Sequence, residues 1–211
     1  AFNKGFTSEA VVFDVFTEFN ASCDAYGNGK ANCYHPGNYD DAYRGPMTLK
    51  NALAQSINII AVKMLYIVGI RDAIKTARDL GITTLTTDGD RYGLSLVIGG
   101  GETKLLDMVS AYGAFATEGI RHPYRSILKV ETNDGNVLEE AVPDEGYRVL
   151  PENTTRIISD ILSDNTARTP TFGANSILIT QGIDTALKTG TTNDNKDAWT
   201  ICYSTNAVVG V

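Results

Sequence analysis

The sequence predicts a mixed α/β (α+β) chain, with helices in the middle and antiparallel strands at the C-terminal end. Two patterns lead to this fold class. Between residues 48 and 117, apolar side chains recur every three or four positions, which is the period of an amphipathic helix. Between residues 185 and 211, three short apolar runs are separated by only a few residues, and such short connections join antiparallel neighbours.

Composition indicates a folded domain and excludes some partners. The 211 residues are 43% hydrophobic and 20% charged, which is typical of a globular chain. The formal net charge of −7 leaves no basic face for phosphates, so we expect no nucleic-acid partner. The most apolar run, from Ile59 to Ile70, is shorter than the roughly 20 residues of a membrane-spanning helix.

The helices are predicted from caps, apolar spacing and terminating glycines. Thr48 is a good N-cap for the first helix, and Thr103 is the expected opening residue of a later one. The segment before them, up to Gly45-Pro46, is predicted to be loops and strand fragments. The expected helices begin at Thr48, after Asn58 (ending at Gly69), and at 71–80, 105–117 and 152–163.

The strands are predicted from period-two patterns and turn residues. Asn133-Asp134-Gly135 is a hairpin turn between two short alternating arms. The expected strands are 126–130 and 136–138 in this hairpin, followed by 185–189, 197–203 and 207–211.

Two cysteines, Cys23 and Cys33, flank a turn-rich stretch and allow two interpretations. They either form a disulfide, which would imply an oxidising extracytoplasmic compartment, or remain free thiols. The two histidines, His35 and His122, lack the spacing of a zinc site, so we expect neither a metal nor a cofactor. Because histidine is scarce, a hydrolytic or transfer reaction would take its base from Lys, Glu or Asp.

Two short motifs carry groups suited to acyl-transfer chemistry. Lys188-Thr189-Gly190 at a strand end places an ammonium, a hydroxyl and a residue of minimal bulk along one edge. Ser56-x-Asn58, between two helices, offers a hydroxyl and a carboxamide from a tight turn. Either motif alone is common, as a solvated strand end or as a helix cap.

Together and in this order, the motifs resemble the second and third motifs of the penicillin-recognising serine enzymes. The longer strings around them resemble the transpeptidase domain of class A, bifunctional penicillin-binding proteins, over nearly the whole chain. This resemblance implies the penicillin-binding protein / serine β-lactamase-like fold, a mostly antiparallel sheet flanked by helices. The matching strings are 38–40, 44–62, 103–112 and 188–199.

The resemblance also implies a function. It predicts a peptidoglycan D,D-transpeptidase that cross-links stem peptides ending in D-Ala-D-Ala through an acyl-serine intermediate, and that binds β-lactams. The implied catalytic residues are Ser56, Asn58 and Lys188, and the implied substrate-binding residues are Thr189, Gly190 and Thr191.

One family motif, the S-x-x-K that supplies the nucleophilic serine and its lysine, departs from the pattern. The one such string here, Ser126 to Lys129, follows the second motif instead of preceding it. It also lies on a predicted strand, where these two side chains point to opposite faces, so we reject it.

We therefore expect residues 1–211 to be a partial transpeptidase domain that lacks the first motif and the first strands and is inactive alone. Its parent is expected to be extracytoplasmic and membrane-anchored, with a glycosyltransferase domain. Two alternatives stay open. One is a non-catalytic scaffold or sensor of the same fold, and the other is a serine β-lactamase or D,D-carboxypeptidase.

Overall fold

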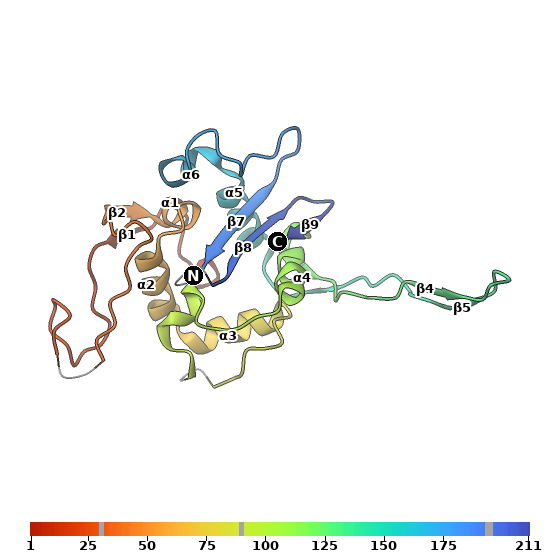
Figure 1. Cartoon of the computed structure of the whole chain (residues 1–211), viewed down its shortest axis with the longest axis horizontal. Coiled ribbons are helices and arrows are strands. Elements are labelled where there is room, and N and C mark those ends of the chain that lie inside the picture. The colour runs from red at the N-terminus through yellow and green to blue at the C-terminus, as the bar shows by residue number, and fades with distance from the viewer. Residues whose placement is uncertain (30–31, 89–90, 193–195) are drawn as a thin grey trace.

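The computed structural model describes residues 1–29, 32–88, 91–192 and 196–211. Helices surround a small central sheet, and one long hairpin projects from the body (Figure 1). The helices are α1 (Leu49–Ala54), α2 (Asn58–Val68), α3 (Ile70–Asp79), α4 (Leu105–Ala116), α5 (Glu152–Ser163) and α6 (Asn165–Phe172), with 3-10 turns η1 (Phe2–Lys4) and η3 (Gly93–Ile98).

All strand pairs between described residues are antiparallel, as the short connections predicted for the hairpin and for the strands after residue 185. The pairs are β1–β2, β3–β6 and β4–β5, and the central sheet has the order β7-β8-β9. The strands are β1 (Val11–Asp14), β2 (Gly45–Thr48), β3 (Ile120–Arg121), β4 (Lys129–Glu131), β5 (Val137–Glu140), β6 (Tyr147–Arg148), β7 (Ala186–Thr191), β8 (Ala198–Tyr203) and β9 (Val208–Gly210).

The local helix signals were largely confirmed. The Thr48 hydroxyl accepts the Asn51 backbone N–H at 3.2 Å and caps α1 as predicted. Helix α2 ends at Gly69, and α5 has the predicted bounds. The expected cap at Thr103 was wrong: the N-cap residue of α4 is Lys104, which makes no capping side-chain bond.

Several elements escaped the sequence patterns. Gly45-Pro46, at the end of a segment expected to be mostly irregular, belongs to β2, where Pro46 lies opposite Phe13 in a two-stranded sheet that tolerates a missing N–H. Helix α6 contains Pro170, a residue that argues against a helix interior. Strands β3 and β6 are two residues long and show no period.

Buried clusters hold the corner between α1 and α2 close to the central sheet. Leu49 and Ile60 lie in the cluster that joins the two helices. Ala186 of β7 and Tyr203 of β8 pack with α5, and Leu53 of α1 contacts that second cluster. The side chains of α1 therefore place the start of α2 next to the strand that carries Lys-Thr-Gly.

The β4–β5 hairpin forms the long arm in Figure 1. Its strands begin and end within a few residues of the predicted arms. Among the helices of the described chain, none has the length and apolar character needed to cross a membrane.

Candidate active site

The site begins at the sharp corner between α1 and α2. Ser56 has a φ of 59°, in the left-handed region that costs a non-glycine residue about 1 kcal/mol or more. The corner is held by the backbone bond from the Ile57 N–H to the Ala52 carbonyl at 2.9 Å and by the buried Gln55 amide, which donates to the Ala167 carbonyl at 3.1 Å. These contacts fix the position from which the Ser56 hydroxyl projects.

Lys188 of β7 reaches this corner. Its ammonium donates to Ser56 Oγ at 2.6 Å and to the Thr189 carbonyl at 2.6 Å. Two motifs separated by 132 residues are therefore in direct hydrogen-bond contact.

The electrostatics of Lys188 differ from those of a surface lysine. Desolvation by burial lowers its pKa from 10.5 to about 8. Both bonded oxygens are neutral, so the positive charge of the protonated side chain is not cancelled by them and can attract an anion.

The rest of the third motif lies along an open strand edge. Within the described residues, β7 pairs with β8 on one side only. Gly190 and Thr191 are exposed, and a Cβ at Gly190 would meet nothing within 4 Å. An edge of this kind can bind an extended peptide through main-chain hydrogen bonds. Residues 193–195 of the matching string lie outside the described chain.

Asn58, the first residue of α2, points elsewhere. Its amide nitrogen donates to the Gly37 carbonyl at 3.1 Å, and no bond joins its side chain to Ser56 or Lys188 among the described contacts. The structure thus links Asn58 to the segment that precedes β2.

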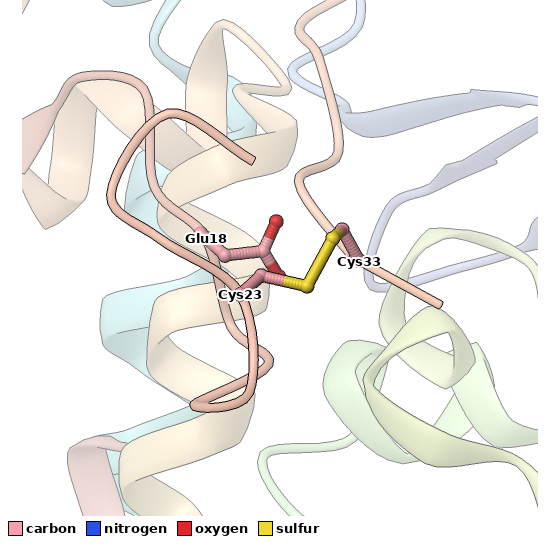
Figure 2. A group of neighbouring side chains, drawn as sticks. All are labelled: Glu18, Cys23 and Cys33. Carbon is pink, nitrogen blue, oxygen red and sulfur yellow. A yellow bond between two sulfur atoms is a disulfide. The ribbon is translucent and has the colours of Figure 1, made fainter. Parts of the chain in front are cut away.

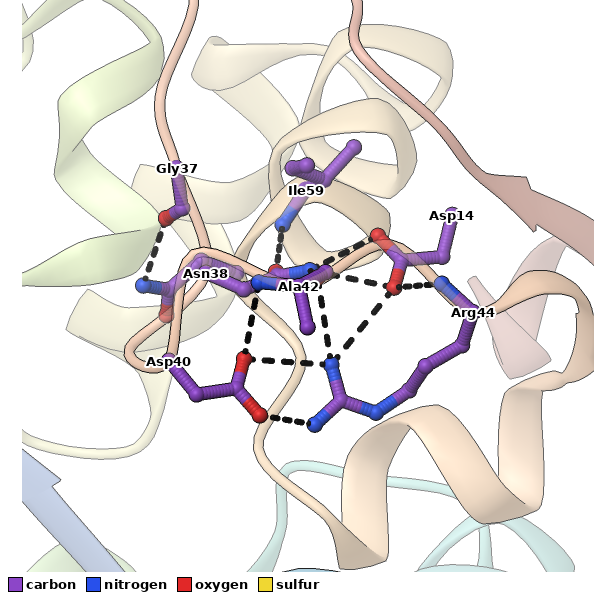
Figure 3. Close-up of polar contacts among 8 residues, drawn as sticks. Asp14, Gly37, Asn38, Asp40, Ala42, Arg44 and Ile59 are labelled. Atoms are coloured by element: carbon purple, nitrogen blue, oxygen red, sulfur yellow. Dashed lines mark hydrogen bonds and ion pairs between the residues drawn. The ribbon is translucent and has the colours of Figure 1, made fainter.

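Sequence reasoning assigned no role to the residues around this contact. Asp14, at the end of β1, is fully buried and bonds the side chain of Asn38, which follows Gly37 (Figure 3). Asn38 lies in one of the matching strings, which was an available signal. Asp14 carries no local signal, because its burial results from the packing of distant segments.

Of the two interpretations of Cys23 and Cys33, free thiols or a disulfide, the structure shows the disulfide. Cys23 and Cys33 are bonded, with their sulfurs 2.09 Å apart. An oxygen of Glu18 and the two sulfurs lie within 4.8 Å of one another (Figure 2). Because the sulfurs are in a disulfide and not thiolates, this group does not form a metal site. The Glu18 carboxylate is bonded to His35 Nδ1 at 2.8 Å instead.

The rejected string, Ser126 to Lys129, is not organised for catalysis. Ser126 precedes β4 and is exposed, and Lys129 forms an ion pair with Glu131. Neither residue lies on a helix.

Comparisons with known proteins identify the family. The profile described as "Penicillin binding protein transpeptidase domain" matches residues 9–208. Penicillin-binding protein 1A of Neisseria meningitidis (serogroup A) is 32% identical to this chain. The match covers 100% of this chain and 26% of that protein. Penicillin-binding protein 1A of Aquifex aeolicus is 35% identical over 88% of this chain and 24% of its own length. The chain thus spans about a quarter of these curated relatives.

Solved structures agree. Penicillin-binding protein 1A from Haemophilus influenzae has a TM-score of 0.75 at 25% identity, covering 98% of this chain and 34% of that one. The penicillin-binding protein PonA1 from Mycobacterium tuberculosis shares the fold, with a TM-score of 0.77 at 23% identity over 99% of this chain and 54% of that one. The matched profile, these relatives and the shared fold together place the chain in the penicillin-binding protein transpeptidase family, among the class A members that its motifs predicted.

Proposed function

We propose that residues 1–211 form the substrate-binding part of a peptidoglycan D,D-transpeptidase domain that recognises stem peptides ending in D-Ala-D-Ala. The observation that carries this proposal is the 2.6 Å contact between Lys188 Nζ and Ser56 Oγ. It joins an ammonium, a hydroxyl and an open strand edge, which together suit a peptide that ends in a carboxylate.

The strand edge binds the substrate terminus in this proposal. Lys188 attracts the C-terminal carboxylate, and the hydroxyls of Thr189 and Thr191 hydrogen-bond it. Gly190 adds no side chain, so the substrate backbone can approach the strand closely. The Thr191 backbone N–H forms one half of an oxyanion hole, a contribution of about 2.7 to 4 kcal/mol for one donor in related acyl transfer.

Ser56 and Asn58 act close to the peptide bond that reacts. Since Lys188 donates to Ser56 Oγ, the Ser56 hydroxyl proton is free to pass to the leaving nitrogen. Asn58 holds an amide group of the substrate.

The covalent step needs a nucleophile from outside the 211 residues. In the family reaction, a serine hydroxyl deprotonated by lysine attacks the penultimate D-Ala carbonyl, and the C–N bond to the terminal D-Ala breaks as its nitrogen takes up a proton. An amine of a neighbouring stem then displaces the serine oxygen. A β-lactam undergoes the first step only. Because S-x-x-K at a suitable place is absent from this sequence, we propose that the chain alone neither transfers nor acylates.

The compartment and parent protein are part of the same proposal. We place the domain on the outer side of the cell membrane, in a membrane-anchored parent with a glycosyltransferase domain. The Cys23–Cys33 disulfide fits an oxidising compartment. The relatives named penicillin-binding protein 1A, of which the chain spans about a quarter, leave room for such further parts.

Labelling with a fluorescent penicillin tests the proposal. The 211-residue chain should remain unlabelled, whereas the parent protein with its upstream sequence should form a covalent adduct that Lys188→Ala and Ser56→Ala slow. Covalent labelling of the 211-residue chain would refute the proposed inactivity. Absence of labelling in a folded parent would instead indicate a non-catalytic binding module.

A further inference from the structure

Asp14 and Asn38 form a buried polar network beside Ile59, near the start of α2 (Figure 3). Asp14 is 0% exposed, and its carboxylate accepts the Asn38 amide at 2.9 and 3.0 Å and the Arg44 backbone N–H at 3.0 Å. The Arg44 guanidinium is 3.8 Å away and is itself bonded to Asp40 at 2.6 Å. The carboxylate is therefore well satisfied and holds Asn38 in one orientation.

Asn38 in turn holds the start of α2. Its Oδ1 accepts the Ile59 backbone N–H at 3.3 Å, while its Nδ2 donates to Asp14 and to the Ala42 carbonyl. The N-cap residue of α2, Ile57, has no side-chain acceptor for this orphan N–H. Asn38 therefore caps the helix from 21 residues away.

The neighbouring carbonyl orients Asn58. Gly37 precedes Asn38 directly, and its carbonyl accepts the Asn58 Nδ2 at 3.1 Å. A carboxamide has one donor end and one acceptor end. With one N–H committed to Gly37, the Asn58 carboxamide is held in one orientation, and its second N–H and its oxygen remain able to bind a ligand.

We infer that Asp14 and Asn38 are positioning residues that orient the Asn58 carboxamide toward an amide group of the bound substrate. This role rests on the proposed function for the identity of the ligand, but the orientation itself does not. The residues act through the Gly37 carbonyl and the capped α2 start, and neither touches the reacting atoms in this proposal.

The orientation of the Asn58 carboxamide can be tested without an activity assay. In the 15N-labelled chain, nuclear magnetic resonance follows exchange of the Asn58 side-chain amide and of the Ile59 backbone N–H. We expect Asn38→Ala to speed both exchanges on the order of tenfold, the effect of losing about one hydrogen bond. Unchanged exchange at Asn58 in the folded variant would overturn the inference.

A matched control separates this effect from general loosening. Asp107 of α4 is 1% exposed and bonds the backbone and hydroxyl of Thr83, so Asp107→Ala removes a comparable buried clasp elsewhere in the fold. Asp107→Ala should leave the exchange of the Asn58 side-chain amide unchanged relative to the global opening rate. If it sped up this exchange as much as Asn38→Ala does, the inference would be overturned. If Asn38→Ala does not fold, the isosteric Asp14→Asn should give the same change at smaller size.

Substrate recognition is tested in the parent protein, which supplies the nucleophile. Two ligands are compared: a fluorescent penicillin with an acylamido side chain, and 6-aminopenicillanic acid, which lacks the acylamide. Asn38→Ala should slow acylation by the first ligand on the order of tenfold more than by the second.

The outcomes distinguish the two proposals. An equal loss with both ligands would overturn the recognition role of Asn38. If the wild-type parent is acylated by neither ligand, the proposed function fails, whereas the exchange measurement still decides whether Asp14 and Asn38 orient Asn58.

Discussion

Replacing Lys188 with Met tests whether the charge in the site costs folding free energy. The two side chains are similar in length, but Met carries no charge and no donor. Desolvation lowers the Lys188 pKa from 10.5 to about 8, so the folded state disfavours the ammonium relative to the unfolded chain. The variant should therefore be more stable than the wild type at neutral pH and inactive in the parent protein.

The magnitude follows from linkage. At about 1.4 kcal/mol per pKa unit, lowering from 10.5 to about 8 corresponds to roughly 3 kcal/mol against folding. Lost hydrogen bonds to Ser56 and Thr189 offset about 1 kcal/mol or more of this gain. A folded pKa below the unfolded value means that the penalty is fully present below pH 8 and disappears as the pH rises toward 10.5. The advantage of the variant should shrink over that window.

Urea unfolding at pH 7, 8.5 and 10 measures this difference, with Trp199 fluorescence as the probe. Lys50→Met is the control, because the ion pair of Lys50 with Asp164 at 2.6 Å raises the Lys50 pKa. Its folded pKa lies above the unfolded value of 10.5, so Lys50→Met should destabilise the fold by an amount that stays constant from pH 7 to 10 and shrinks only as the pH rises further, through that folded value. A Lys188→Met advantage that stays constant from pH 7 to 10 would refute the reasoning.

Three further predictions concern stability. Reducing the Cys23–Cys33 disulfide, which closes a ten-residue separation, should lower the free energy of unfolding by about 2 to 3 kcal/mol in urea titrations with and without reductant. Desolvation acts to raise the Asp107 pKa, but the hydrogen bonds from Thr83 outweigh it, so the net pKa is lowered. The free energy of unfolding should therefore fall as the pH drops through that lowered pKa. Asp107→Asn should remove this dependence in acid titrations. Gly119 has a φ of 96°, and an added Cβ would clash with the Leu150 carbonyl oxygen, so Gly119→Ala should lower the melting temperature by several degrees. An unchanged melting temperature would contradict the close approach.

Local signals in the sequence were sufficient for much of the fold. Thr48 and Gly69 mark where α1 begins and where α2 ends, because a capping hydroxyl and a glycine at positive φ act over one turn of chain. The Asn133-Asp134-Gly135 turn predicted the β4–β5 hairpin for the same reason. Helix α6 was missed because Pro170 opposes it locally, while the packing of Ala167 against α1 and α5 stabilises it.

The candidate site divides in the same way. The sequence by itself determined the two motifs, the family that they indicate and the absence of a suitable S-x-x-K. Only the tertiary structure decided that Lys188 contacts Ser56, that burial lowers the Lys188 pKa, and that the Gly37 carbonyl accepts a hydrogen bond from the Asn58 amide. These properties depend on distances and solvent exclusion between segments far apart in the chain, which no local pattern of residues encodes.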